Sequence, residues 1–219
     1  MSCFDRFKIS AAELPAELPI FPLPGALLLP GGRLPLNIFE PRFLNMVLAA
    51  MQSPSRLIGM IQPMDGESMD DDTELYKTGC AGRISSFSET NDNRILITLH
   101  GVCRFDAHEA RLAPGGYRAV RADWSAYAHD LEPDAKIEID RPAVLKSLRE
   151  YFDHIKMPVD WDAVQNAPNA VLINSLAMAC PFDFKEQQLL LEAPKICDRA
   201  KIMCCLLQMG VHECGDNKH

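Results

Sequence analysis

The sequence lacks long hydrophobic runs and any excess of positive charge. No stretch approaches the ~18 uninterrupted apolar residues that a membrane-spanning helix needs. Residues 1–8 carry charges with no apolar run behind them, so we expect no signal peptide and a cytoplasmic protein. The formal net charge is −8, and acidic residues outnumber basic ones in both halves of the chain. Because nucleic-acid backbones are bound through clustered Lys and Arg, this balance argues against a nucleic-acid partner.

The sequence also lacks the local motifs of several enzyme classes. It contains neither the G-x-x-x-x-G-K-[ST] loop that binds nucleotide phosphates nor the G-x-S-x-G turn that presents a nucleophilic serine. His108-Glu109 and His212-Glu213 each lack the second histidine that a helix-borne zinc site requires. The acidic residues within 65–74 are consecutive instead of alternating, which favours a solvated loop over a calcium site. We therefore expect no catalytic residues, no metal and no cofactor.

The chain contains eight cysteines, which are Cys3, Cys80, Cys103, Cys180, Cys197, Cys204, Cys205 and Cys214. In a short secreted chain they would suggest disulfides, but in a cytoplasmic protein of 219 residues we expect reduced thiols. Several lie on apolar stretches, where a free cysteine acts as a small buried hydrophobe. A hydrolase that uses a Cys-His pair in a cleft between two lobes remains an alternative, and a low thiol pKa beside a histidine would favour it.

Strand patterns dominate the chain before residue 125. Residues 14–24 are dense in proline, which predicts an extended edge strand because proline removes ladder donors. A short apolar strand at 34–38 is followed by a helix that begins with Glu40-Pro41 and runs to about Gln52. Further strands are expected at 57–62, 79–88, 94–100, 102–111 and 117–124. The turn sequences at 90–93 and 113–116 favour antiparallel hairpins, and a meander of this kind closes into a small barrel.

From Asp140 onward the apolar period becomes that of a helix. Asp140 is a suitable N-cap with a proline just after it, and a shorter helix is expected to begin at 160–162. Another helix is predicted at 169–179. Asp183 and Glu186 have the spacing of a capping box, and a last helix follows Pro194. Four or five helices joined by short loops predict a compact bundle.

Together these patterns predict the α+β class. Residues 14–124 are expected to form an antiparallel β-barrel lobe that carries one helix, and residues 140–214 a helical bundle lobe. The polar stretch at 125–139 is the expected linker.

The first lobe contains five distinctive blocks, which are LPIFPL (18–23), LPGGRLPLNIFEPRF (29–43), LIGM (57–60), LYKTGCAGRI (75–84) and LHGVCRF (99–105). These blocks resemble the N-terminal substrate-binding domain of Lon proteases, the La family. Residues 174–182 and 187–194 resemble the helical half of stand-alone bacterial relatives of that domain, so the resemblance covers nearly the whole chain. The glycines at 31–32 and 79–82 suit a tight turn and the close backbone approach of a small barrel.

The resemblance implies a PUA-like barrel and a module that binds polypeptides. Full Lon enzymes continue into an ATPase module and a peptidase module with a Ser-Lys dyad, whereas this chain ends in the polar tail at 215–219. The resemblance therefore implies neither ATP hydrolysis nor proteolysis. The implied partners are unfolded or tagged polypeptides, with the cell's protease or a chaperone as further partners; a homodimer is left open.

The candidate polypeptide contacts are Phe39, Arg42, Phe43 and Met60, near the turn between the strand at 34–38 and the helix after it. The competing interpretation places Phe39 and Phe43 in the core and uses Glu40 with Arg42 only to cap the helix.

RNA binding is the other alternative, because PUA-like barrels often serve RNA-modifying systems. It requires five arginines to line one sheet face, with Tyr117 exposed beside them. They are Arg83, Arg94, Arg104, Arg118 and Arg121.

Overall fold

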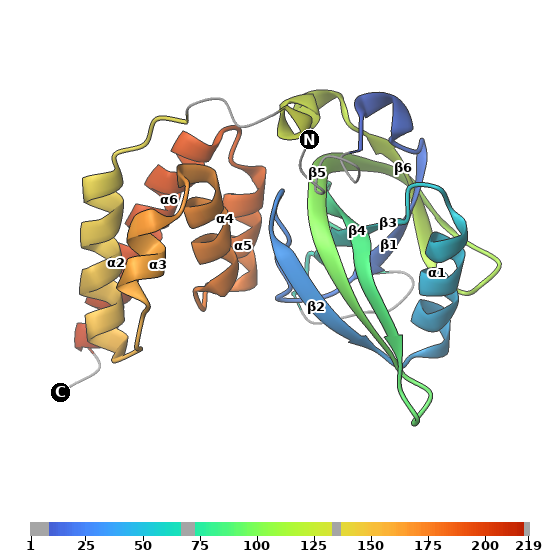
Figure 1. The fold of residues 1–219 in the computed structure, drawn as a ribbon, viewed down its shortest axis with the longest axis horizontal. Helices are drawn as coiled ribbons and strands as arrows, with labels where there is room; N and C mark the ends of the chain where they lie inside the picture. The colour runs from blue at the N-terminus through green and yellow to red at the C-terminus, as the bar shows by residue number, and fades with distance from the viewer. Residues whose placement is uncertain (1–8, 67–72, 133–136, 217–219) are drawn as a thin grey trace. The chain divides into compact units, whose positions relative to one another are not determined.

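The computed structural model describes residues 9–66, 73–132 and 137–216 and divides the chain into two compact units, 1–133 and 134–219 (Figure 1). Most of the acidic run at 65–74, Cys3 and the side chains of 212–214 lie outside the described residues. The predictions about a calcium site, and about His212-Glu213, therefore stay predictions.

The first unit is a barrel of strands with one α-helix. Its elements are η2 (Ala11–Glu13), β1 (Glu17–Pro22), β2 (Arg33–Ile38), α1 (Pro41–Gln52), β3 (Leu57–Ile61), β4 (Thr78–Glu89), β5 (Ile95–Leu112), β6 (Arg118–Asp123) and η3 (Ser125–Leu131). The strands form one sheet in the order β2-β5-β4-β3-β1-β6, and β5 also pairs with β6. That second pairing closes five strands into a ring and leaves β2 outside it (Figure 1). The predicted α+β class and the closed barrel are confirmed.

One long strand, β5, replaces the two strands predicted at 94–100 and 102–111, so that prediction is wrong. Gly101 lies in the middle of β5 without interrupting it. A Cβ atom at Gly101 would lie 2.0 Å from the backbone oxygen of Leu29, so this glycine allows a close approach of two chain segments. The first part of β5 pairs with β2 and the last part with β6, while β4 accompanies it from Ile95 to Asp106.

The proline-rich strand β1 is not an edge strand, which corrects the prediction for residues 14–24. It pairs antiparallel with β6 and parallel with β3. The prolines are tolerated because the two partners cover different parts of β1: β6 pairs with 17–20 and β3 with 20–22. The parallel pair was not expected, whereas the antiparallel pairs β3–β4, β4–β5 and β5–β6 follow the predicted hairpin pattern.

Phe105 occupies the centre of the barrel core and is fully buried. A Cβ at Gly59 or Gly79 would lie 2.7 or 2.6 Å from its ring, so both positions need glycine to leave room for the aromatic side chain. At Gly79 the added atom would also lie 2.6 Å from the backbone oxygen of Met60. The expectation of close backbone approach at 79–82 is thus confirmed for Gly79.

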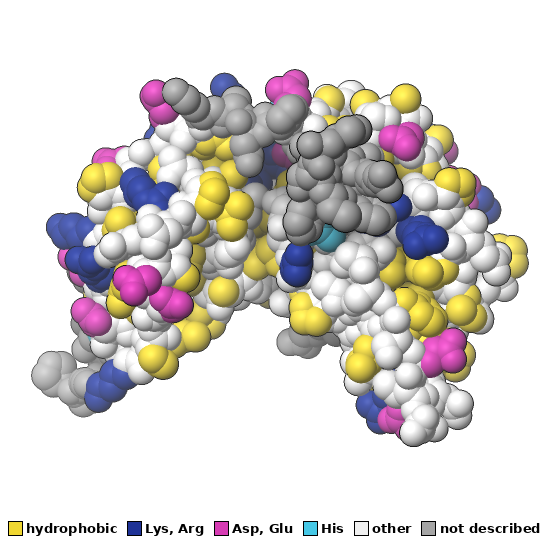
Figure 2. Space-filling model, in the orientation of Figure 1, with side chains coloured by type: hydrophobic (Ala, Val, Ile, Leu, Met, Phe, Trp, Pro, Cys, Tyr) yellow, Lys and Arg dark blue, Asp and Glu magenta, His cyan; other side chains and the backbone are white. Residues whose placement is uncertain are grey.

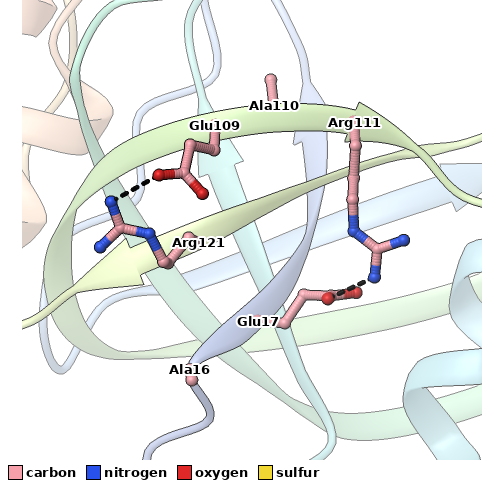
Figure 3. Close-up of a pocket in the computed structure, with 6 residues that line it drawn as sticks. All are labelled: Ala16, Glu17, Glu109, Ala110, Arg111 and Arg121. Carbon is pink, nitrogen blue, oxygen red and sulfur yellow. Dashed lines mark hydrogen bonds and ion pairs between the residues drawn. The ribbon is translucent and has the colours of Figure 1, made fainter.

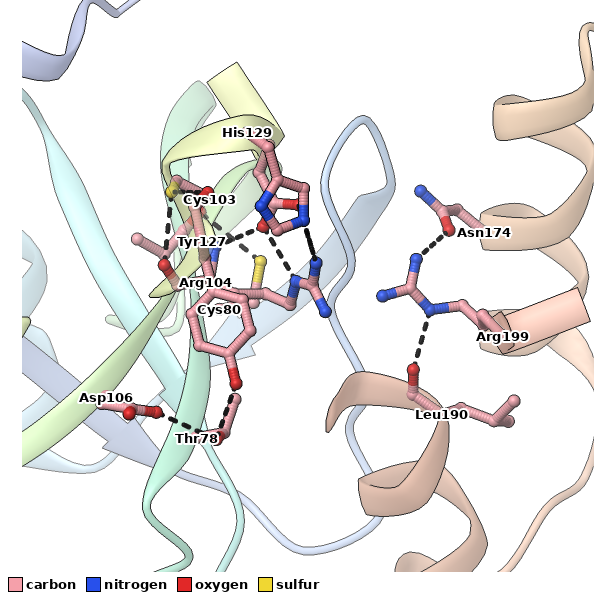
Figure 4. Close-up of polar contacts among 12 residues, drawn as sticks. Thr78, Cys80, Cys103, Arg104, Asp106, Tyr127, His129, Asn174, Leu190 and Arg199 are labelled. Carbon is pink, nitrogen blue, oxygen red and sulfur yellow. Dashed lines mark hydrogen bonds and ion pairs between the residues drawn. The ribbon is translucent and has the colours of Figure 1, made fainter. Parts of the chain in front are cut away.

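A buried ion pair fastens η3 to the barrel (Figure 4). Arg104 of β5, only 2% exposed, donates from Nε and Nη2 to the two carboxylate oxygens of Asp130 over 2.8 and 2.9 Å. Its guanidinium also lies over the Tyr127 ring, with 4.4 Å to the ring centroid. Burial alone lowers the pKa of Arg104, but the hydrogen bonds to Asp130 raise it, and the side chain stays charged. Residues 125–131, expected to be part of a linker, therefore pack as η3 on β5.

The second unit consists of helices at the predicted places. They are α2 (Arg141–Ile155), α3 (Trp161–Asn166), α4 (Asn169–Ala179), α5 (Phe184–Glu192) and α6 (Ile196–Asp216). Asp140 caps α2 by accepting from the backbone N–H of Ala143, and the capping box of Asp183 and Glu186 begins α5. Within this unit α2, α4 and α5 all pack on α6. Buried Arg199 of α6 donates to the backbone oxygen of Leu190 and to Asn174 Oδ1, which ties α6 to both α5 and α4 (Figure 4).

We expect Asp130→Asn to lower the free energy of unfolding of the barrel unit by about 3–5 kcal/mol, because it leaves a buried guanidinium without its counter-charge. Urea unfolding is followed by the fluorescence of Trp124, whose ring lies 5.7 Å from that of Phe105, in a Trp161→Phe background. Glu109→Gln removes the exposed partner of Arg121 and should leave the midpoint nearly unchanged. Equal midpoints for Asp130→Asn and Glu109→Gln would contradict the stabilising role of the buried pair.

Candidate functional site

The outer face of β2 and β5 exposes two large apolar side chains close to each other. Asn37 of β2 pairs with Leu96 of β5, so their side chains share a face, and Phe39 lies two residues further along the same row. Phe39 is 60% exposed and Leu96 44%. The guanidinium of Arg94 lies over the Phe39 ring at 5.7 Å from its centroid and also pairs with Asp92. This apolar pair with a cationic rim, which we call the Phe39–Leu96 surface, can accept an apolar side chain from a ligand.

Arg42, at the start of α1, lies close to this turn but is held by its own neighbours. Its Nε donates to Glu40 Oε2 over 3.0 Å, and its guanidinium lies 4.7 Å from the Phe43 ring centroid. About a quarter of the side chain remains exposed, 26%. Arginine near a helix N-terminus is disfavoured by the helix dipole, and the Glu40 carboxylate offsets that cost.

Two of the four predicted contact residues, Phe43 and Met60, have buried side chains, and we remove them from the contact surface. Phe43 is 4% exposed and packs against Phe21, with the ring centroids 4.2 Å apart. Met60 is 2% exposed on β3, whose five residues are all buried. The helical period of α1 turns Phe43 toward the core. On β3, Leu57 and Ile61 belong to the barrel core, so strand alternation puts Met60 on the opposite face of the sheet, where it is also buried; α1 contacts β1 and β3.

The sequence interpretation missed Leu96, although its pattern holds the signal. In 95–100 the buried residues alternate with more exposed ones, and Leu96 falls on the outward phase where a polar residue is usual. A large hydrophobe in the outward phase of an alternating strand indicates an exposed contact site.

Four of the five arginines required for RNA binding are engaged by other groups of the chain. Arg104 is buried against Asp130, while Arg94 and Arg121 pair with Asp92 and Glu109. Arg118 donates to the backbone oxygen of Thr73. On the face drawn in Figure 2, Lys and Arg side chains lie among acidic and hydrophobic ones. This distribution gives no continuous track for a phosphate backbone.

The buried cysteines do not have the properties of activated nucleophiles. Burial raises the pKa of both Cys103 and Cys180 to about 12, and it also raises the pKa of Cys204. Cys103 Sγ donates to the backbone oxygens of Arg104 and Tyr127 (Figure 4). A thiol held neutral in this way is a packing group instead of a nucleophile.

A shallow hollow on β1, β5 and β6 is lined by two ion pairs (Figure 3). Arg111 pairs with Glu17, and Arg121 with Glu109 at 2.9 Å. The guanidinium of Arg121 lowers the pKa of Glu109, and the hydrogen bond to Glu17 raises the pKa of Arg111. Since each charge is matched by its neighbour, the hollow has no net charge to select an ionic ligand.

Among residues 9–66, 73–132 and 137–216, no group of three or more His, Cys, Asp or Glu side chains is placed to hold a metal ion. None of the helices described there is both long and apolar enough to span a bilayer.

Comparison with known proteins points to one family. The family model of the ATP-dependent protease La (LON) substrate-binding domain matches residues 17–209. Lon protease 1 of Syntrophotalea carbinolica is 26% identical over 160 residues, which is 70% of this chain and 19% of that protein. The chain thus spans about a fifth of the length of this curated relative.

Two solved structures share the fold. The crystal structure of a Lon N-terminal domain protein from Xanthomonas campestris has a TM-score of 0.62 and 24% identity, covering 86% of this chain and 97% of the other. The N-terminal domain of a Lon protease from the Mycobacterium avium complex has a TM-score of 0.64 and 14% identity, covering 88% and 98%. With a family model that matches residues 17–209, this chain belongs to the ATP-dependent protease La (LON) substrate-binding domain family.

Proposed function

We propose that this protein binds extended polypeptides through the Phe39–Leu96 surface and carries out no chemistry on them. The observation that carries the proposal is the exposed apolar pair on the outer face of β2 and β5, in a chain of a substrate-binding family. Arg94 borders the surface, and we also propose Arg42, near the same turn, as a contact; both guanidinium groups can donate to the backbone carbonyls or carboxylates of a bound segment.

The size of the surface predicts weak, transient binding. Phe39 and Leu96 are already partly covered, so burying the remainder of both contributes on the order of 2 kcal/mol before the cost of ordering the ligand. Weak binding suits a module that samples many sequences, because apolar contact and backbone recognition do not demand a particular side chain at each position.

We further propose that its ligands are unfolded or tagged polypeptides, that a cellular protease or chaperone is a further partner, and that it acts in the cytoplasm. The free thiols support a reducing compartment: the described cysteines Cys80, Cys103, Cys180, Cys197, Cys204 and Cys205 are all unbridged. Sedimentation velocity measures whether the protein also forms a homodimer.

We expect Phe39→Ala and Leu96→Ala each to weaken the binding of an unfolded polypeptide by about tenfold, because each removes a central apolar contact. Fluorescence anisotropy of a labelled, reduced and carboxymethylated protein fragment measures the affinity. Leu112→Ala is the matched control: Leu112 is 59% exposed but lies at the other end of β5, so its loss should change affinity less than twofold. Equal affinities for all three variants and the wild type would contradict the proposed surface.

Arg42→Ala should weaken binding less than Phe39→Ala, and mainly at low ionic strength, because a charge at the rim acts through screened electrostatics. Titrations in about 50 mM and about 500 mM salt separate the electrostatic contribution of Arg42 from any contribution that does not depend on salt. Thermal melts are expected to change little, since the pair with Glu40 is partly exposed. An affinity equal to that of the wild type in low salt would remove Arg42 from the surface.

Cys103 and Cys180 should resist alkylation in the folded protein at pH 8, because a pKa of about 12 leaves on the order of one thiolate in 10⁴ molecules. Exposed Cys205 should react readily, and all three should react after unfolding in guanidinium. Iodoacetamide labelling with peptide mass spectrometry reads each cysteine separately. Rapid labelling of Cys103 in the native state would support the Cys-His hydrolase alternative.

A further inference from the structure

The edge of β2 that faces away from β5 offers backbone hydrogen-bonding groups to a second strand. Gly101 donates to the backbone oxygen of Gly32 and accepts from the N–H of Gly31, both over 2.9 Å, so the backbone of Gly101 points toward the β2 side. Backbone direction alternates along a strand, and the register of β2 and β5 is unbroken. Leu99, Ile97 and Ile95 therefore also point toward β2.

The backbone groups of β5 that face β4 agree with this assignment of directions. Arg94, at the start of the strand, accepts from the N–H of Thr90 in the β4–β5 hairpin, so the even-numbered positions of β5 point toward β4. Leu34, Leu36 and Ile38 are opposite Leu99, Ile97 and Ile95, and their N–H and C=O groups are used in the pairing with β5.

The groups of Arg33, Pro35 and Asn37 consequently point away from β5. No strand in the described part of the chain pairs with that edge of β2. Proline has no N–H, and Pro35 falls on the outward phase, where the missing donor costs β2 nothing in its pairing with β5. The outer edge thus presents three acceptors, the oxygens of Arg33, Pro35 and Asn37, but only two donors.

Side chains at the two ends of this edge define what can bind there. Phe39, which follows the last residue of β2, is exposed at one end. At the other end Arg33 is exposed beside His100, and it forms no ion pair with a described carboxylate. Leu34 and Leu36 are only partly buried on the inner face, so an added strand would cover them with its own apolar side chains. The complementary ligand is extended, amphipathic, apolar toward Phe39 and acidic toward Arg33.

We propose that β2 binds such a segment of another polypeptide by strand addition, through main-chain hydrogen bonds along its outer edge. This inference rests on the proposed function, since it specifies how the strand beside the Phe39–Leu96 surface holds a polypeptide. Main-chain pairing makes recognition nearly independent of sequence. The alternation of apolar and polar side chains in the ligand fixes its register, and its apolar and acidic ends, matched to Phe39 and Arg33, fix its direction.

Backbone methylation of the ligand tests the proposal without altering the protein. The probe is a capped seven-residue peptide that alternates threonine with valine or phenylalanine and carries an aspartate at one end. Two further peptides carry N-methyl groups on alternate residues, in opposite phases. In only one of these two peptides do the methyl groups replace the N–H hydrogens that face the three acceptors of β2. We expect one methylated peptide to lose at least tenfold in affinity and the other less than twofold.

A matched pair of variants tests the protein side. Asn37→Pro and Asn37→Ala both remove the amide side chain, but only the proline removes the outward N–H. Pro35, at the preceding outward position of β2, already lacks this group. We expect Asn37→Pro to bind the unmethylated peptide more weakly than Asn37→Ala by roughly threefold or more, while thermal melts show that both variants are folded. Equal affinities for these two folded variants would count against strand addition.

The possible failures are distinguishable. If all three peptides bind equally well, strand addition is wrong and the proposed function stands. If neither the peptide nor an unfolded protein fragment binds, the proposed function itself is wrong. Sedimentation velocity with and without peptide identifies a third outcome: a dimer that Asn37→Pro dissociates and that excludes the peptide would make a second copy of this chain the occupant of β2 and overturn the proposal.

Discussion

The closure of the barrel by β5 is the constraint on which the rest of the first unit depends. This strand pairs with β4 along most of its length, with β6 at its end and with β2 at its beginning. The ring therefore closes through the second half of β5, and β2 is left as an appendage of the first half. The exposed edge and the Phe39–Leu96 surface are both consequences of that geometry, because a strand outside the ring keeps one edge unpaired.

Close approach at the centre makes this closure possible. The ring of Phe105 fills the interior, and it fits there because Gly59 and Gly79 have no side chains. The buried pair of Arg104 and Asp130 then fastens η3 across β5. A buried ion pair contributes little net stability compared with apolar packing, but it is costly to break, so it specifies one position for η3 instead of many.

The function proposed for this chain depends on a surface instead of a reactive group. Burial raises the pKa of Cys103 and Cys180, and Arg94 and Arg121 pair with carboxylates, so the proposal depends mainly on hydrophobic contact and backbone hydrogen bonding. Those interactions are common to all polypeptides. They suit the proposed binding of polypeptides of many sequences, which would need no local sequence motif.

The sequence by itself determined the local features of this protein. Its helix boundaries, the caps at Asp140 and Asp183, the change from strand to helical period and the family blocks all depend on residues close together in the chain, where side-chain and backbone chemistry act directly. Tertiary structure alone decided which strands became neighbours. It placed the proline-rich β1 inside the sheet, joined two predicted strands through Gly101, and buried Phe43 and Met60 while exposing Phe39. These outcomes depend on contacts between segments far apart in sequence, whose pairing is set by barrel closure and core volume and not by local propensity.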